Sequence, residues 1–144
     1  MTTHRLSFFV PSALVSLALV AGCAGGIDSK LPADAHVDHM QADRLVLRGT
    51  AAAAERPSCT DSGLAAMHYV ELPGDMTGKI ELRAARSASA VLHVKNLDTN
   101  KIWCMTTKAD GTMPSIPGEF AGGTYAVSVS ETSAQPYEVV FERL

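Results

Sequence analysis

Hydrophobic and polar residues alternate in short segments from residue 44 to the end of the chain. In residues 79–84, for example, Ile80 and Leu82 alternate with charged residues. A period of two residues is typical of a β-strand that buries one face and exposes the other. Strands are therefore predicted at residues 44–48, 67–72, 79–84, 90–97, 102–106, 124–130 and 137–141.

Turn-forming residues separate these segments. They lie at Gly49, Pro73, Gly74, residues 98–100, Gly122 and Gly123. No long segment with a helical period competes with the strand pattern after the N-terminal segment. We therefore predict an all-β domain over residues 44–144, a single antiparallel β-sandwich of jelly-roll-like architecture.

The pattern also makes predictions for individual positions and loops. His93 lies on the polar side of its strand and is expected to face solvent. Residues 51–54 are four alanines between turn-forming residues, and we expect them to form a loop. Residues 114–118 contain two prolines, which is too many for a central strand, so they are also expected to form a loop.

The first 22 residues have the organisation of a secretory signal. His4 and Arg5 form a short positive segment, and residues 6–22, which follow, carry no charge. This uncharged stretch is shorter than the roughly 20 apolar residues that a helix needs to cross a hydrocarbon core. A short apolar segment after a positive one is typical of a signal peptide that is cleaved.

The end of this segment, Val20-Ala21-Gly22-Cys23, resembles the lipobox of bacterial lipoproteins. The resemblance implies that the Cys23 thiol carries a diacylglyceryl group, that cleavage falls between Gly22 and Cys23, and that the new amine is acylated. Two or more acyl chains hold a protein stably on a membrane. Ala24 follows the cysteine, and the resemblance implies that a residue other than Asp there directs the protein to the outer membrane.

In this interpretation residues 1–22 are the signal peptide, residues 23–43 a lipidated flexible tether, and residues 44–144 the folded domain. The membrane is then a partner through the lipid on Cys23. Two alternatives stay open: an ordinary signal peptide cleaved beside a cysteine, and an uncleaved membrane anchor. No further apolar segment approaches the length of a membrane span.

The densest polar cluster in the chain lies in the tether. It consists of Asp34, His36, Asp38 and His39. Imidazole and carboxylate groups could hold a transition metal. No helix or strand is expected to fix their geometry, however, so a solvated linker is the favoured interpretation, and no metal or other cofactor is predicted.

Cys59 and Cys104 are left when Cys23 is assigned to the lipid. An even number of cysteines in an exported protein favours one disulfide bond. Two separate free thiols are the alternative. A zinc site is poorly supported because the sequence contains no pair of cysteines at the spacing typical of zinc ligands.

Composition and charge exclude some classes of function. The chain has 12 Lys and Arg residues against 15 Asp and Glu residues, a formal net charge of −3, which excludes a nucleic-acid binder that relies on a strong basic field. Aromatic residues make up 6% of the chain, too few for an extended base-stacking platform. No nucleic acid is therefore expected as a partner.

The domain as a whole resembles the bacterial pre-peptidase C-terminal domains. The segments that carry the resemblance are residues 47–50, Cys59, residues 68–72, 79–82 and 90–94, Cys104, and residues 120–129 and 137–141. These domains are small jelly-roll sandwiches appended to secreted proteases and other exported proteins. The resemblance implies an auxiliary role, here expected to be in trans or lost because no protease domain precedes these segments in the sequence.

Candidates for chemistry are few. The chain has no recognisable catalytic signature, although His68 and His93 could join a triad assembled by folding. Acidic loop residues that could bind calcium are Asp61, Asp75, Asp98, Asp110 and Glu119, but loop carboxylates usually stabilise turns. Trp103, the single tryptophan, either packs in the core or offers a platform to a sugar or a protein partner.

Together these observations predict a lipid-anchored lipoprotein of the bacterial envelope whose domain is a non-catalytic binding or structural module. Its partner would be an envelope protein or a glycan, with Trp103 as the candidate binding residue. A carbohydrate- or protease-associated auxiliary domain is the alternative, and a hydrolase without a recognisable motif is the third.

Overall fold

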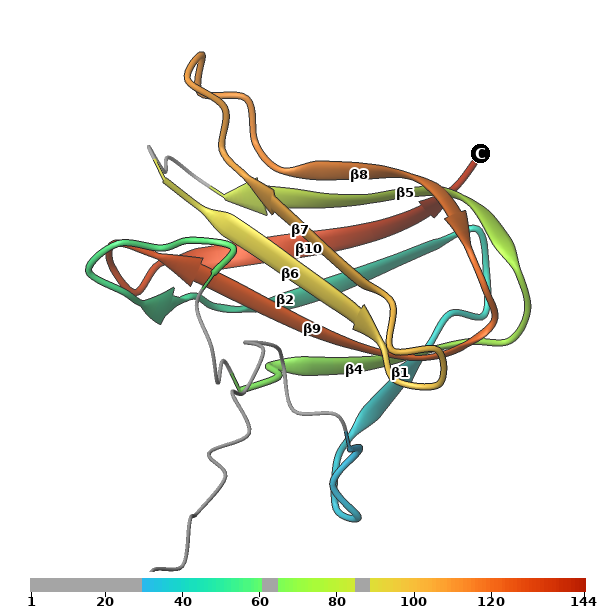
Figure 1. The fold of residues 1–144 in the computed structure, drawn as a ribbon. Helices are drawn as coiled ribbons and strands as arrows, with labels where there is room; N and C mark the ends of the chain where they lie inside the picture. The colour runs from blue at the N-terminus through green and yellow to red at the C-terminus, as the bar shows by residue number, and fades with distance from the viewer. Residues whose placement is uncertain (1–29, 61–64, 85–88) are drawn as a thin grey trace, which may run out of the picture.

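The computed structural model describes residues 30–60, 65–84 and 89–144, which form two β-sheets lying one across the other (Figure 1). Sheet A contains, in spatial order, β1 (Val37–His39), β4 (His68–Leu72), β9 (Gly123–Glu131), β6 (Val91–Asn96) and β7 (Ile102–Thr106), with β3 (Ala52–Ala53) beside the end of β9. Sheet B contains β2 (Arg44–Thr50), β10 (Pro136–Arg143), β5 (Met76–Ala84) and β8 (Ser115–Phe120). The predicted all-β sandwich is confirmed.

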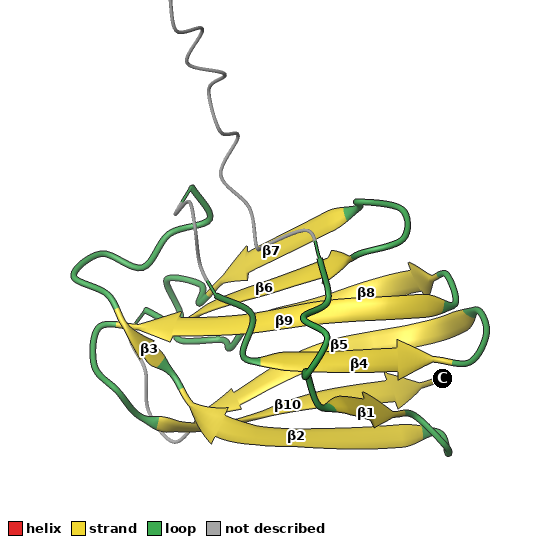
Figure 2. Ribbon diagram, turned by 90° about the horizontal axis from the view of Figure 1, so that it is seen from below, coloured by secondary structure: helices red, strands yellow, loops and turns green. Residues whose placement is uncertain are grey.

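Eight of these strands are connected as in a jelly roll. The order β4-β9-β6-β7 in sheet A faces the order β2-β10-β5-β8 in sheet B, and neighbours in these orders are antiparallel (Figure 2). All connections between them cross from one sheet to the other except the β6–β7 turn. Two short pairings depart from the predicted antiparallel arrangement, since β1 with β4 and β3 with β9 are parallel.

The hydrophobic core lies between the inner faces of the two sheets. Tyr125, Val127 and Val129 of β9 have 0% exposure, and so have Val139 and Phe141 of β10 in the other sheet. These are the faces that the alternation predicted to be buried, because every second side chain of a strand points to the same side. Removing this apolar surface from water, at roughly 25 cal/mol per Å², is the main force that holds the sheets together.

The folded domain begins before residue 44. β1 pairs with β4, and Met40, which follows β1, is 3% exposed. Residues 37–40 were predicted to belong to the flexible tether, and for them that prediction is wrong. The physical reason is that β4 would otherwise end the sheet with an open row of backbone donors and acceptors, which β1 pairs.

Two segments that were predicted as loops contain strands. Within residues 51–54, Ala52–Ala53 forms β3, and the Ala54 amide donates to the Glu131 carbonyl at 2.7 Å. Residues 114–118 overlap β8, which pairs with β5 on one side and is the edge of sheet B. The prolines exclude a central strand as predicted, but an edge strand tolerates them because one row of its backbone groups needs no partner strand.

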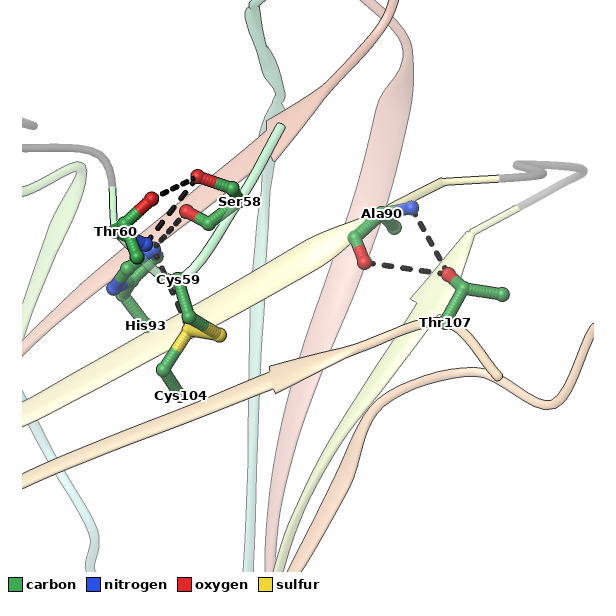
Figure 3. The surroundings of a disulfide bond; sticks show 7 residues. All are labelled: Ser58, Cys59, Thr60, Ala90, His93, Cys104 and Thr107. Atoms are coloured by element: carbon green, nitrogen blue, oxygen red, sulfur yellow. Dashed lines mark hydrogen bonds between the residues drawn. A yellow bond between two sulfur atoms is a disulfide. The ribbon is translucent and has the colours of Figure 1, made fainter. Parts of the chain in front are cut away.

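The outer face of sheet A is covered near its β7 edge by the loop of residues 57–60 (Figure 3). His93 of β6 is 4% exposed, and its Nε2 lies 3.3 Å from the Ser58 carbonyl oxygen and 3.6 Å from Cys104 Sγ. The prediction that His93 faces solvent is therefore wrong. Alternation gave the correct side of the strand, but this loop covers that side.

A disulfide between Cys59 and Cys104 fixes the covering loop to β7. The predicted pairing is confirmed, and the two Cα atoms lie 5.7 Å apart. In the register of β6 and β7, Cys104 lies opposite His93, so both side chains are on the outer face of sheet A. Trp103, one residue earlier on β7, consequently lies on the inner side.

The disulfide is expected to supply a large part of the domain's stability. It closes a loop across 45 positions, so replacing both cysteines by alanine should lower the free energy of unfolding by about 2–4 kcal/mol. Urea unfolding with and without a thiol reductant measures this. Reductant should lower the wild-type value to that of the double variant and leave the variant unchanged; an unchanged wild type would contradict the prediction.

Candidate functional site

An open groove lies at one end of the sandwich, where the β4–β5, β6–β7 and β8–β9 connections meet. The β4–β5 and β8–β9 connections are at the right in Figure 1. Its volume is about 720 Å³, within the roughly 300–1,000 Å³ of typical small-ligand sites. It is lined by Asp75, Met76, Thr77, Asn96, Thr99, Lys101, Trp103, Glu119, Phe120, Ala121 and Tyr125. The groove therefore has contributions from both sheets.

Trp103 joins the core to the groove. Its ring centroid lies 5.4 Å from that of Phe120 and 6.1 Å from that of Tyr125, both of which are almost fully buried. Trp103 itself is only half-buried because β7 is the edge of sheet A. The indole packs against core residues and also lines an open groove.

The ammonium group of Lys101 lies over the indole of Trp103. Nζ is 4.8 Å from the ring centroid, within the range of a cation–π interaction. The two residues are two positions apart on the chain, and this spacing places them on the same side of a strand. Sequence reasoning missed Lys101 as a site residue, although the spacing of Lys101 and Trp103 was the signal that could have found it.

The tyrosine beneath the groove is held by the backbone. The Tyr125 hydroxyl donates to the Ala121 carbonyl at 2.6 Å. Burial raises the pKa of Tyr125, and the Asn96 amide nearby acts more weakly in the opposite direction. Tyr125 therefore stays a neutral phenol under ordinary conditions and forms part of the groove's aromatic base.

Asp75 and Asn96 stabilise the turns around the groove. Asp75 Oδ1 accepts from the Gly122 amide at 2.9 Å, which ties the β4–β5 turn to the β8–β9 turn. Asn96 Oδ1 accepts from the amides of Asp98 and Thr99, both at 2.9 Å. Asn96 Nδ2 is buried and makes no hydrogen bond of normal length and angle within the described part of the chain.

Of the acidic residues considered as calcium ligands, Asp75, Asp98 and Asp110 lie in different connections between strands, and Glu119 lies on β8. Asp98 accepts from the Thr124 amide and Asp110 from the Thr112 amide, each at 2.9 Å. Asp61 lies outside the described residues. No group of three or more His, Cys, Asp or Glu side chains that could hold a metal ion occurs among the residues described.

The polar cluster expected in the tether forms pairs rather than one group. His36 Nε2 lies 3.3 Å from Asp38 Oδ1, and His39 Nδ1 lies 2.9 Å from Glu71 Oε2 on β4. Cys23, the predicted lipidation site, lies outside the described residues. Within residues 30–60, 65–84 and 89–144, no helix is long and apolar enough to span a bilayer.

A polar pair that sequence analysis did not find bridges the two sheets at another part of the core. His68 Nε2 of β4 and the Tyr137 hydroxyl of β10 are 2.8 Å apart. Burial raises the pKa of Tyr137 to about 12, and burial also lowers the pKa of His68 despite an opposing effect of Asp38. The pair stabilises the core in its neutral form, and nothing around it in the described residues suggests a substrate site.

The comparisons with known proteins add no assignment to this geometry. Neither a known protein-family model nor a curated protein sequence matches the chain.

The lowered pKa of His68 predicts a specific pH dependence of stability. Below about pH 6.5 the unfolded chain binds more protons at this residue than the folded chain does, so acidification destabilises the fold. A His68→Gln variant should lose less stability than wild type between about pH 7 and pH 5 in urea unfolding. A His36→Gln variant, changed at a side chain that is 88% exposed, serves as control. Equal pH slopes for wild type and His68→Gln would contradict the prediction.

Proposed function

We propose that this protein is a lipid-anchored lipoprotein of the bacterial envelope whose β-sandwich domain is a non-catalytic binding module. The proposal of a lipid anchor rests on the sequence Val20-Ala21-Gly22-Cys23, which follows a short positive and apolar segment. Lipid on Cys23 would hold the domain at the membrane, and Ala24 favours the outer membrane. The disulfide of the domain is in keeping with an oxidising, exported location.

The groove supports the binding role. It combines a half-buried indole with charged and amide side chains, the mixture of apolar surface and a few polar groups that small-ligand sites use. The jelly-roll connectivity also supports the proposed relationship to the pre-peptidase C-terminal domains. By that relationship the module would act beside other exported proteins rather than carry out chemistry itself.

Replacing Cys23 tests the anchor. A Cys23→Ala variant expressed in a bacterial host should keep its signal segment, because the cleavage that the lipobox implies follows lipid attachment. It should also lose labelling by radioactive palmitate, whereas wild type should be shortened and labelled. Mass spectrometry of the intact protein and membrane fractionation give the readouts.

A variant with alanine at both Cys59 and Cys104 is the matched control, since it removes two cysteines but leaves the lipobox intact. It should be labelled and processed like wild type. Processing, labelling and membrane association of Cys23→Ala equal to those of wild type would overturn the anchor proposal.

A further inference from the structure

We infer that the groove beside Trp103 binds a saccharide, with a pyranose ring lying against the indole. This inference deepens the proposed binding role and rests on it. It names the class of ligand and assigns the contacts to Trp103, Lys101 and Asp75, which come from two separate parts of the chain, the start of β7 and the β4–β5 connection.

The aromatic surface sets the first requirement on the ligand. Trp103 is only half-buried, and Phe120 and Tyr125 support it from within the core. A rigid, supported aromatic ring is suited to a flat apolar face, because little side-chain entropy is lost on contact. The C–H face of a pyranose has this shape, and its hydroxyl groups project from the edge of the ring.

The polar groups set the second requirement. Lys101 supplies donors and Asp75 supplies acceptors on the lining of the groove. A purely apolar ligand would desolvate these groups without replacing their hydrogen bonds with water, which is costly. A hydroxylated ring instead offers donors and acceptors together, so it can satisfy both kinds of group.

The balance of charge excludes a strongly anionic ligand. Among the residues that the structure describes, the groove lining carries Asp75 and Glu119 against one cation, Lys101. Two carboxylates would repel a phosphate or a polyanionic chain at short range. A neutral sugar meets no such penalty, so the lining favours a neutral pyranose.

Lys101 covers part of the proposed binding surface. Its ammonium lies over the indole, so the sugar must take its place. An exposed cation–π contact is weak, and the long flexible lysine side chain can move its amine to a ligand hydroxyl. The lysine thus protects the indole from water without blocking the groove permanently.

The single tryptophan makes the inference directly measurable. The mature protein is first applied to a printed glycan array, and the terminal sugar of the bound glycans is then titrated as its methyl glycoside while Trp103 fluorescence is followed. Saturable binding of a neutral pyranose, with a change in fluorescence, is the expected result. Choline, a quaternary ammonium compound, is titrated in the same way. Binding of choline in place of a sugar would identify an ammonium site and overturn the inference. The absence of binding to any glycan would also overturn it.

Variants locate the site and control for folding. Trp103→Ala should weaken array binding about tenfold or more, and Asp75→Asn, which keeps an oxygen for the Gly122 amide, should weaken it about threefold to tenfold. Ile102→Ala is the matched control, because Ile102 neighbours Trp103, is 48% exposed and does not line the groove. Urea unfolding verifies that each variant is folded. Full binding by both Trp103→Ala and Asp75→Asn would overturn the assignment to this groove.

The two proposals can fail separately. If Cys23→Ala disproves the lipid anchor while the sugar still binds, only the location proposed for the protein is lost. If Cys23 carries lipid but no saccharide binds in the groove, the ligand class named here is wrong and the anchor stands.

Discussion

Every feature of this domain depends on one requirement, that the inner faces of two sheets exclude water together. Tyr125, Val127 and Val129 in sheet A and Val139 and Phe141 in sheet B are fully buried, and neither sheet could bury its row without the other. The jelly-roll connections meet this requirement by sending the chain back and forth between the sheets. The connections lie at the ends of the sandwich, outside the shared core, so the surfaces at these ends can vary in shape.

The outer face of sheet A has a second, smaller layer of burial. β6 and β9 are buried along most of their length on both sides, although their outward residues include polar side chains such as His93 and Ser130. Residues 57–60 cover part of this face, and the bond from Cys59 to Cys104 keeps them there. A covalent bond is an effective solution where a polar interface supplies little hydrophobic driving force of its own.

The groove follows from where the edge strands end. β7 is the last strand of sheet A, so Trp103 on its inner side has core residues on one side and no further strand to cover it. The same incomplete coverage leaves the indole partly exposed to the groove. Lys101 lies over the ring, so a stabilising contact within the domain occupies the surface that the proposed saccharide would use.

The sequence by itself determined the fold class, because the period-two alternation encodes which side of each strand is buried. It also predicted the pairing of Cys59 with Cys104, with two free thiols as the alternative, and the structure confirms the pairing. For the groove, the sequence indicated Trp103 as a candidate residue. It did not indicate on which side of β7 the indole ring lies. That side depends on how β7 pairs with β6, and in the observed register Cys104 lies opposite His93. The hydrophobic pattern of residues 102–106 would be the same if the register were shifted by one residue, so the pattern does not tell which side is inward.

Tertiary structure decided everything that requires two distant segments to meet. β1 is a strand because the edge of β4 accepts it, and β8 is a strand despite its proline because it lies at the edge of sheet B. His93 is buried because a loop crosses its face, and no local pattern carries that information. The groove likewise exists only where three turns, separated along the chain, converge at one end of the sandwich.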